Sequence, residues 1–172
     1  MTTLKASIFI TIALFISNNA MALDDDINQP TLIFSDNQKI DIDNSFAIYS
    51  GNVTIKQGSI LITADLLKIH NNGQPGQEVM VLTGNPATFS QALELDGTVK
   101  ASAKAIRFER ANNTITLNID AQLQQNESLV KSQFISYDMA HKVLIANGNS
   151  KGDSDPSKRV ITILQPTTDK KD

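Results

Sequence analysis

The chain has 172 residues, no cysteine and a formal net charge of −3 at pH 7. The lack of cysteine excludes disulfide cross-links and thiolate metal sites, so stability must come from packing alone. The basic residues are scattered among carboxylates, which argues against a nucleic-acid partner because binding phosphates requires a basic face.

The N-terminal residues have the pattern of a cleavable export signal. Lys5 supplies a short positive region, residues 6–16 are apolar apart from two hydroxyl side chains, and Ala20-Met21-Ala22 has the small-x-small form of a cleavage site. The apolar run is shorter than the roughly 20 residues that span a bilayer. We therefore expect residues 1–22 to be a signal peptide and residues 23–172 to form one exported domain, with an ordered core at about 28–166.

Apolar and polar residues alternate through most of the remaining chain, which is typical of half-buried β-strands. From residue 115 to residue 123 every odd-numbered residue is apolar and every even-numbered residue is polar. Turn signals such as Ser50-Gly51-Asn52, Gln57-Gly58-Ser59 and Ala111-Asn112-Asn113 separate the segments at short intervals. The predicted strands are 32–34, 46–49, 53–56, 60–63, 66–69, 79–82, 106–109, 134–137, 143–146 and 160–164, with further alternation at 39–43 and 115–123.

A two-strand cassette recurs along this chain. Gly51-Asn52-Val53-Thr54 returns as Gly84-Asn85-Pro86-Ala87 and, more weakly, around Ile119-Asp120. Each copy is followed by a small residue and an apolar pair, at 64–69, 103–108 and 132–137. Roughly four units, about 30 to 39 residues apart, would stack and bury their apolar faces on one another. This repetition predicts a stacked β architecture and does not suggest an enzyme pocket.

A stack of this kind ends in unpaired strands on both sides. The terminal segments 31–34 and 160–164 are apolar and uncharged, so we expect them to add to strands of another copy or of a partner. The alternative is that flexible tails cover both edges. The residues expected at these edges are Leu32, Phe34, Val160, Ile161, Ile163 and Leu164.

Several short motifs follow one another in a specific order and spacing. They are Asn28-Gln29-Pro30, Ser50-Gly51-Asn52-Val53 with Gln57-Gly58 and Ala64-Asp65, Gly84-Asn85-Pro86-Ala87-Thr88-Phe89, Leu123-Gln124-Gln125 and Lys158-Arg159-Val160. Together they resemble the LptA/OstA-like periplasmic bridge proteins of lipopolysaccharide export, over about residues 28–166. In the third copy Ile119-Asp120 stands where that family has Gly-Asn, which puts the left-handed backbone that glycine allows there in question.

The resemblance implies a fold, a ligand and partners. The fold would be a twisted antiparallel β-jellyroll that is open at both ends. The ligand would be lipopolysaccharide, bound through lipid A in the periplasm, and copies of the protein would assemble head to tail. The further partners would be an inner-membrane-anchored component and an outer-membrane component, both with the same β-jellyroll fold.

Carrying lipid A through water requires burial of its acyl chains, which contributes about 0.8 kcal/mol per methylene group. A jellyroll can provide this if its interior holds a lengthwise apolar slot. The resemblance implies that the slot is lined by Ile27, Thr31, Ile33, Phe89 and Phe108, and alternation adds Val53, Ile55 and Ile62. Ordinary core packing is the alternative for each of these residues.

No catalytic, metal or cofactor site is predicted. His70 and His141 have no second ligand at a metal-binding spacing in the local sequence, and no nucleophile motif or phosphate-binding loop occurs. We therefore expect a non-enzymatic lipid-transfer bridge. The alternative function is a periplasmic structural or glycan-binding β-module with a filled core.

Overall fold

The computed structural model of the chain describes residues 26, 28–71, 74, 76–93, 97–138, 141, 143–148 and 159–164. These residues form one antiparallel sheet of ten strands and a single 3-10 turn, η1 (Arg110–Asn112). The predicted all-β antiparallel fold is therefore confirmed. In the described part of the chain, no helix has the length and apolar character needed to span a membrane.

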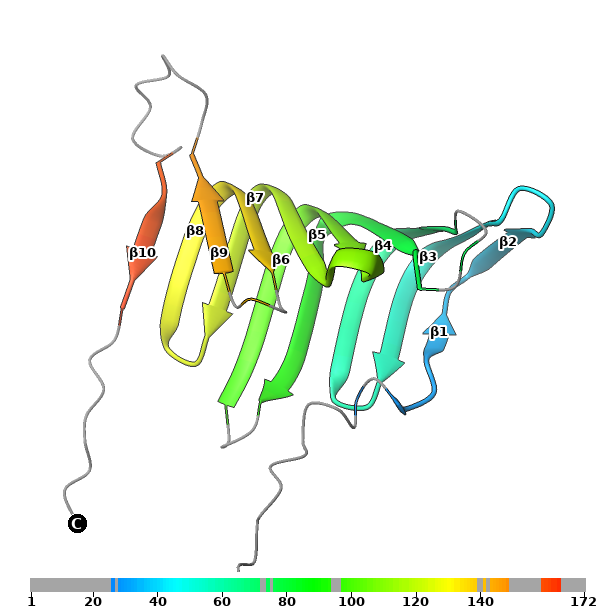
Figure 1. Cartoon of the computed structure of the whole chain (residues 1–172), viewed down its shortest axis with the longest axis horizontal. Helices are drawn as coiled ribbons and strands as arrows, with labels where there is room; N and C mark the ends of the chain where they lie inside the picture. The colour runs from blue at the N-terminus through cyan, green and yellow to red at the C-terminus, as the bar shows by residue number, and fades with distance from the viewer. Residues whose placement is uncertain are drawn as a thin grey trace, which may run out of the picture.

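Six long strands follow one another as neighbouring hairpin strands and form the body of the sheet (Figure 1). They are β3 (Phe46–Gln57), β4 (Ile60–His70), β5 (Val79–Leu93), β6 (Gly97–Glu109), β7 (Thr114–Gln125) and β8 (Ser128–Asp138). Four short strands complete its two ends: β1 (Leu32–Phe34), β2 (Asn37–Asp41), β9 (Val143–Asn147) and β10 (Ile161–Ile163).

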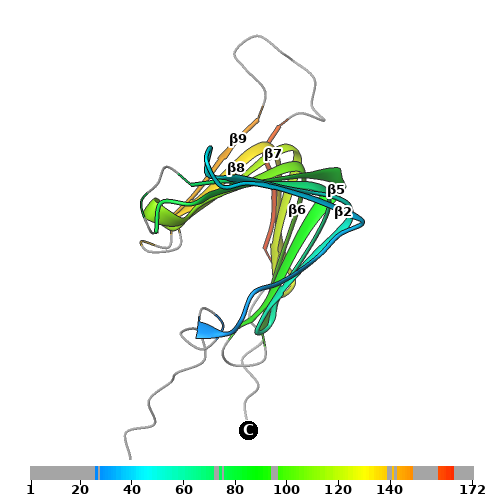
Figure 2. The ribbon, with the colours of Figure 1, turned by 90° about the vertical axis from the view of Figure 1, so that its right-hand side faces the viewer.

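Every strand from β3 to β7 has an irregularity near its middle, where the register with the next strand shifts. Bulges bend a strand and increase its twist. Because these bulges lie side by side, the whole sheet folds along one crease, and the view along its long axis shows a V-shaped profile (Figure 2). The shifts lie between Ser50 and Val53, Thr63 and Leu66, Thr83 and Ala87, Ser102 and Ala105, and Asn118 and Ala121.

The crease divides the sheet into two layers. The first layer contains β2, β9 and residues 46–50, 66–70, 79–83, 105–109, 114–118 and 134–138. The second layer contains β1, β10 and residues 53–57, 60–63, 87–93, 97–102, 121–125 and 128–132.

The crease corrects one part of the sequence prediction. The sequence predicts a chain reversal at Ser50-Gly51-Asn52, but β3 continues through these residues as a bulged strand. The segments 60–63 and 66–69, predicted as two strands, are likewise joined in β4. The predicted reversals at Gln57-Gly58-Ser59 and Ala111-Asn112-Asn113 are confirmed, since both lie between consecutive long strands.

The bulge in β7, which belongs to the third copy of the cassette, keeps a left-handed backbone without glycine. Gly51 and Asn52 have φ values of 79° and 47°, and Ile119 and Asp120 at the corresponding place in β7 have values of 64° and 55°. Ile119 and Asp120 therefore have the same left-handed backbone conformation as Gly51 and Asn52, although no glycine is present. An isoleucine with positive φ is strained, because its branched Cβ crowds the backbone.

Small side chains occupy the inside of the crease. The two layers converge there, so little room is left for a side chain on the inner face. All six residues of this crease row are buried: Val53, Ala64, Ala87, Ala103, Ala121 and Ser132.

Each end of the sheet is completed by two short strands, one in each layer. At the N-terminal end β1 and β2 both pair with β3, and at the C-terminal end β9 and β10 both pair with β8. The sheet is therefore open at both ends within the described residues, as predicted.

Candidate functional site

The inner face of the V is the candidate functional site. In the second layer, one residue of each strand lies in register on this face, so a single row crosses the sheet. From β1 to β8 every member of this second-layer row is apolar, and Thr162 in β10 continues the register beside Val130. The apolar members are Ile33, Ile55, Ile62, Phe89, Ala101, Leu123 and Val130.

The first layer presents two comparable rows to the inside. The row next to the crease consists, from β3 to β9, of Tyr49, Leu67, Leu82, Ile106, Leu117, Ile135 and Ala146, and the exposed Gln38 in β2 lies opposite Tyr49. The row beyond it consists of Ala47, Ile69, Met80, Phe108, Ile115 and Tyr137.

Burial decreases from the crease toward the open side of the V. Leu67 and Ile135, in the row next to the crease, are 0% exposed, whereas Phe108 in the outer row and Phe89 in the second-layer row are half-buried. The crease is therefore a packed core, and the rows farther from it are apolar side chains that keep contact with solvent. Partly exposed apolar side chains arranged in rows can bury the chains of an amphiphile.

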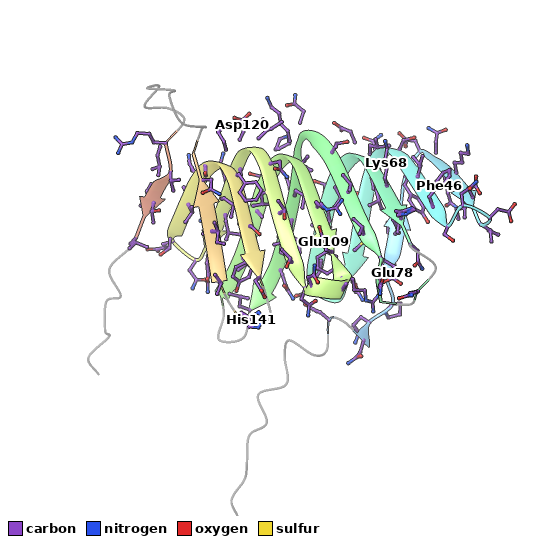
Figure 3. All side chains as sticks on the ribbon, turned by 45° about the horizontal axis from the view of Figure 1, so that its top comes forward. Phe46, Lys68, Glu78, Glu109, Asp120 and His141 are labelled. Atoms are coloured by element: carbon purple, nitrogen blue, oxygen red, sulfur yellow. The ribbon has the colours of Figure 1, made fainter. Side chains whose placement is uncertain are left out.

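Charged side chains of the strands lie outside. Within the described strands, register and alternation place Lys56, Lys68, Lys100, Arg107 and Lys131 on the outer face, and no charged side chain on the inner face. At the crease, Lys104 pairs with Asp120 on the exposed outer side, with 3.1 Å between Nζ and Oδ2. Glu78, Glu109 and His141 lie along one border of the sheet, and Lys68 and Asp120 lie toward the other side (Figure 3).

The outer face also has a hollow, but its chemistry is different. A shallow depression of about 320 Å³ lies over the second layer, and its lining mixes the polar residues Ser90, Lys100, Ser102 and Gln122 with Phe89, Ala101 and Leu129. The hydroxyl, amide and ammonium groups among them interrupt its apolar surface. The inner face remains the candidate site because its apolar rows are continuous from strand to strand.

The segment before β1 is tied to the border of the second layer. The Asp26 carboxylate accepts hydrogen bonds from the backbone N–H of Ser59 (2.6 Å), the Ser59 hydroxyl (2.6 Å) and Gln91 Nε2 (3.0 Å). Burial opposes ionisation of Asp26, but the side-chain and backbone hydrogen bonds from Ser59 and that from Gln91 outweigh it, so the pKa of Asp26 is below its ordinary value. A further bond joins Gln57 Nε2 to the Gln29 carbonyl oxygen (3.1 Å).

The structure brings most of the predicted lining residues to the inner face. Ile33, Ile55, Ile62 and Phe89 lie in the second-layer row. Val53 lies in the crease, Phe108 lies in the first layer, and exposed Thr31 extends the register beyond β1. Ile27 lies outside the described residues. Lipid contact by any of them stays a prediction.

Sequence reasoning missed several residues of the same rows, among them Leu67, Met80, Leu123 and Val130. Alternation marks all of them as apolar strand positions. Alternation does not show which residues of neighbouring strands lie on the same face of the sheet. That depends on the register between strands, and the bulges change the register within a strand.

The predicted edge residues lie on or beside the terminal strands. Leu32 and Phe34 are in β1, and Ile161 and Ile163 are in β10, with their side chains in register with the outer face. Val160 and Leu164 flank β10. All six are exposed, from 41% for Val160 to 76% for Leu164.

Comparisons with known proteins cover most of this chain. The family model described as "LptA/(LptD N-terminal domain) LPS transport protein" matches residues 32–143. The lipopolysaccharide export system protein LptA of Haemophilus influenzae is 35% identical over 162 residues, which cover 93% of this chain and 91% of that protein. LptA of Escherichia coli K12 is 34% identical over 149 residues, with 86% and 77% covered.

A solved structure shows the same fold. The crystal structure of LptH from Pseudomonas aeruginosa, described as the LptA-homologous periplasmic component of the lipopolysaccharide transport device, superposes with a TM-score of 0.72. It is 25% identical to this chain, and the match covers 83% of this chain and 99% of that one. The chain therefore belongs to the LptA/(LptD N-terminal domain) family of lipopolysaccharide transport proteins.

Proposed function

We propose that this protein is a periplasmic carrier that transports lipopolysaccharide from the inner to the outer membrane. It shelters the acyl chains of lipid A on the inner face of the V, and it does so without catalysing a reaction. Family membership supports transport of lipopolysaccharide, and the inner face supports the mode of binding.

The main observation that supports this proposal is that apolar side chains lie on the inner face of the sheet and charged side chains on the outer face. The second-layer row offers an uninterrupted apolar path from Ile33 in β1 to Val130 in β8. Each methylene group removed from water on such a path contributes about 0.8 kcal/mol. Since the strand lysines and arginines face outward, acyl-chain burial dominates binding and phosphate contacts contribute little.

The two open ends of the sheet support a head-to-tail bridge. The terminal strands β1 and β10 are three residues long, and each leaves one side unpaired within the described sheet. Backbone groups on such an edge pair readily with another strand. A second copy of this chain, or membrane-bound partners with the same fold, would extend the sheet and align the inner faces. In this bridge the N-terminal edge meets the inner-membrane partner and the C-terminal edge meets the outer-membrane one.

Export to the periplasm requires removal of the N-terminal segment. The pattern of residues 1–22 supports cleavage after Ala22. Mass spectrometry of the mature protein would give the new N-terminus, and a protein that begins at Leu23 is the expected result.

In-cell photo-crosslinking tests the binding mode. A photoreactive residue at Phe89 or at Phe108 faces inward, and one at Phe134 faces outward, because Phe134 is in register with Asn118 and Asn147 on the outer face. All three positions are half-buried, so they are matched for exposure. We expect lipopolysaccharide adducts at Phe89 and Phe108 only. Equal adducts at Phe134, or protein adducts alone at the inner positions, would favour the filled-core module instead.

A further inference from the structure

A row of uncharged side chains, most of them polar, runs along the inner border of the second layer. It lies two residues farther from the crease than the second-layer row, and the strand registers place Gln57 opposite Ile60, Gln91 opposite Val99, Val99 opposite Gln125 and Gln125 opposite Ser128. Three of its positions are glutamines, and they alternate with Ile60 and Val99. We call this set the amide row: Thr31, Gln57, Ile60, Gln91, Val99, Gln125 and Ser128.

Two glutamines of this row already form hydrogen bonds to the protein's own segment before β1. Gln57 Nε2 donates to the carbonyl oxygen of Gln29 at 3.1 Å, and Gln91 Nε2 donates to the Asp26 carboxylate at 3.0 Å. The acceptors belong to the segment before β1, which is far from both glutamines in sequence. The row can therefore hold oxygen acceptors that lie over the border of the inner face. Toward β8 it continues with Gln125 and Ser128, which are exposed and half-buried respectively.

The border of the first layer differs in charge. There Arg110 Nε lies 3.8 Å from Glu78 Oε2, so the positive charge at that border already faces a carboxylate. The amide row of the second layer contains no ionisable side chain among its seven members. The two borders thus offer different chemistry to a head group. One carries an ion pair, and the other carries neutral hydrogen-bonding groups, with the Asp26 carboxylate bound to Gln91 toward its N-terminal end.

We propose that the amide row is a binding site for the acylated amino-sugar part of a glycolipid head group, with Gln125 and Ser128 as its contacts. This inference rests on the proposed function. Two residues of strand correspond to about 7 Å, so an amphiphile with its chains on Phe89, Leu123 and Val130 places its first polar groups at the amide row. Those groups are amide and ester carbonyls and sugar hydroxyls, and a glutamine side chain can both donate to and accept from them.

Recognition at this row is independent of phosphate. Neutral amides gain nothing from a second negative charge on the ligand, whereas a lysine or arginine site would depend on it. Removal of the phosphates from lipid A should consequently change affinity little. A glycolipid should also bind more tightly than a plain fatty acid, because only the glycolipid reaches the amide row with matching groups.

The test compares Gln125→Leu with Gln122→Leu in the mature full-length protein. Both glutamines are in β7, but Gln122 is in register with Ser102 and Lys131 on the outer face, so it is the matched control. The probes are lipid A, dephosphorylated lipid A and palmitate, each measured by displacement of a fluorescent lipid. We expect Gln125→Leu to weaken binding of both forms of lipid A by roughly three- to tenfold, the effect of one lost neutral hydrogen bond, and to leave palmitate binding unchanged.

Each other result has a distinct meaning. Unchanged lipid A binding by Gln125→Leu, or an equal effect of Gln122→Leu, overturns the amide row as a binding site. A large loss of affinity on dephosphorylation overturns neutral recognition. Failure of the wild-type protein to bind lipid A at all overturns the proposed function itself, and is distinguishable because the other two failures require wild-type binding. Thermal unfolding of both variants checks that each substitution leaves the fold intact.

Discussion

The carboxylate of Asp26 lies where a side chain on Gly58 would have to be. A Cβ atom built on Gly58 would lie 2.1 Å from Asp26 Oδ1 and 2.9 Å from Asp26 Cα. Gly58 also has a φ of +56°, which favours glycine. The tight turn between β3 and β4 is therefore also the place where the segment before β1 packs against the sheet.

The first prediction concerns this contact between Gly58 and Asp26. Gly58→Ala should displace Asp26, break its hydrogen bonds to Ser59 and Gln91, and loosen the N-terminal segment and β1. Gly76→Ala is the control, since Gly76 has a φ of +82° and nothing within 4 Å of its ideal Cβ. Both variants should lose about 1–2 kcal/mol from the left-handed backbone. Only Gly58→Ala should speed amide hydrogen exchange in β1, and equal exchange in both variants would contradict the contact.

The second prediction is the pH dependence of the same contact. The pKa of Asp26 is lower in the folded protein than its ordinary 3.8, so its ionised form stabilises the fold above that pH, and this stability is lost as the pH falls through the lowered value. Asp26→Asn should be less stable than wild type at neutral pH. The difference in unfolding free energy should shrink as the pH falls below 3.8.

Denaturant unfolding at a series of pH values measures this difference. Asp41 and Glu78 also have lowered pKa values, from the hydrogen bonds of Asn44 to Asp41 and from backbone hydrogen bonds to Glu78. Their contributions are present in both proteins and cancel when the two are compared. A difference between wild type and Asp26→Asn that did not change with pH would show that the charge of Asp26 does not contribute.

Alternation and turn signals predicted a segment of every strand but neither the crease nor the full length of the strands. The predicted segments 79–82, 106–109 and 134–137 are only parts of β5, β6 and β8. A Gly-Asn signal satisfies a reversal and a bulge equally well, because both need a residue with positive φ. At Gln57-Gly58-Ser59 the chain turns back, whereas at Ser50-Gly51-Asn52 it continues, with Ser50 opposite Leu66 and Val53 opposite Ala64. Whether the chain reverses or continues depends on how β3 pairs with β4. A local sequence pattern carries no information about that pairing.

The candidate site was predictable to the same extent. Alternation marked Ile55 and the family resemblance marked Phe89 as lining residues, and register then brings both into one row with Ile62 between them. The amide row had no signal of its own in the sequence. A glutamine two residues beyond an apolar position is common in any strand, and only the aligned registers of β3 to β8 make Gln57, Gln91 and Gln125 members of one border.

The third prediction tests the packing of the crease. Ala103 is 0% exposed and lies opposite Ala87, which is also 0% exposed. Ala103→Leu adds three carbon atoms where the layers converge, so the unfolding free energy should fall by about 1–3 kcal/mol. Ala92→Leu, on an exposed position of β5, should change it by less than about 0.5 kcal/mol. Denaturant unfolding of the two variants gives the comparison, and a tolerated leucine at 103 would show that the crease is loosely packed.

The fourth prediction concerns the left-handed isoleucine. Ile119 has a φ of 64° and a side chain that is 51% exposed, so it bears backbone strain and buries little surface. Ile119→Gly should raise the unfolding free energy by up to about 1 kcal/mol, because relief of roughly 1–2 kcal/mol of strain exceeds the entropy that glycine loses on folding. Ile145→Gly is the control: its side chain is 54% exposed but it lies in β9, outside the positive-φ positions. Ile145→Gly should destabilise, and a loss of stability in both variants would mean that Ile119 is unstrained.

The fifth prediction addresses the C-terminal edge. Ile163 in β10 is 45% exposed and lies opposite Leu129, so a lysine there keeps the pairing with β8 while placing a charge on the edge, as natural sheets do to prevent strand addition. Wild type should form oligomers that grow with concentration in analytical ultracentrifugation. Ile163→Lys should weaken this association about tenfold, equivalent to roughly 1.4 kcal/mol, and deletion of residues 160–172 should abolish it. Ile119→Lys is the control: Ile119 is similarly exposed, at 51%, but lies at the crease, so this variant should associate as wild type does. If the wild type and the truncated protein are both monomeric at every concentration, strand addition between copies at β10 is wrong, and the inner faces of successive copies have no sheet to align them.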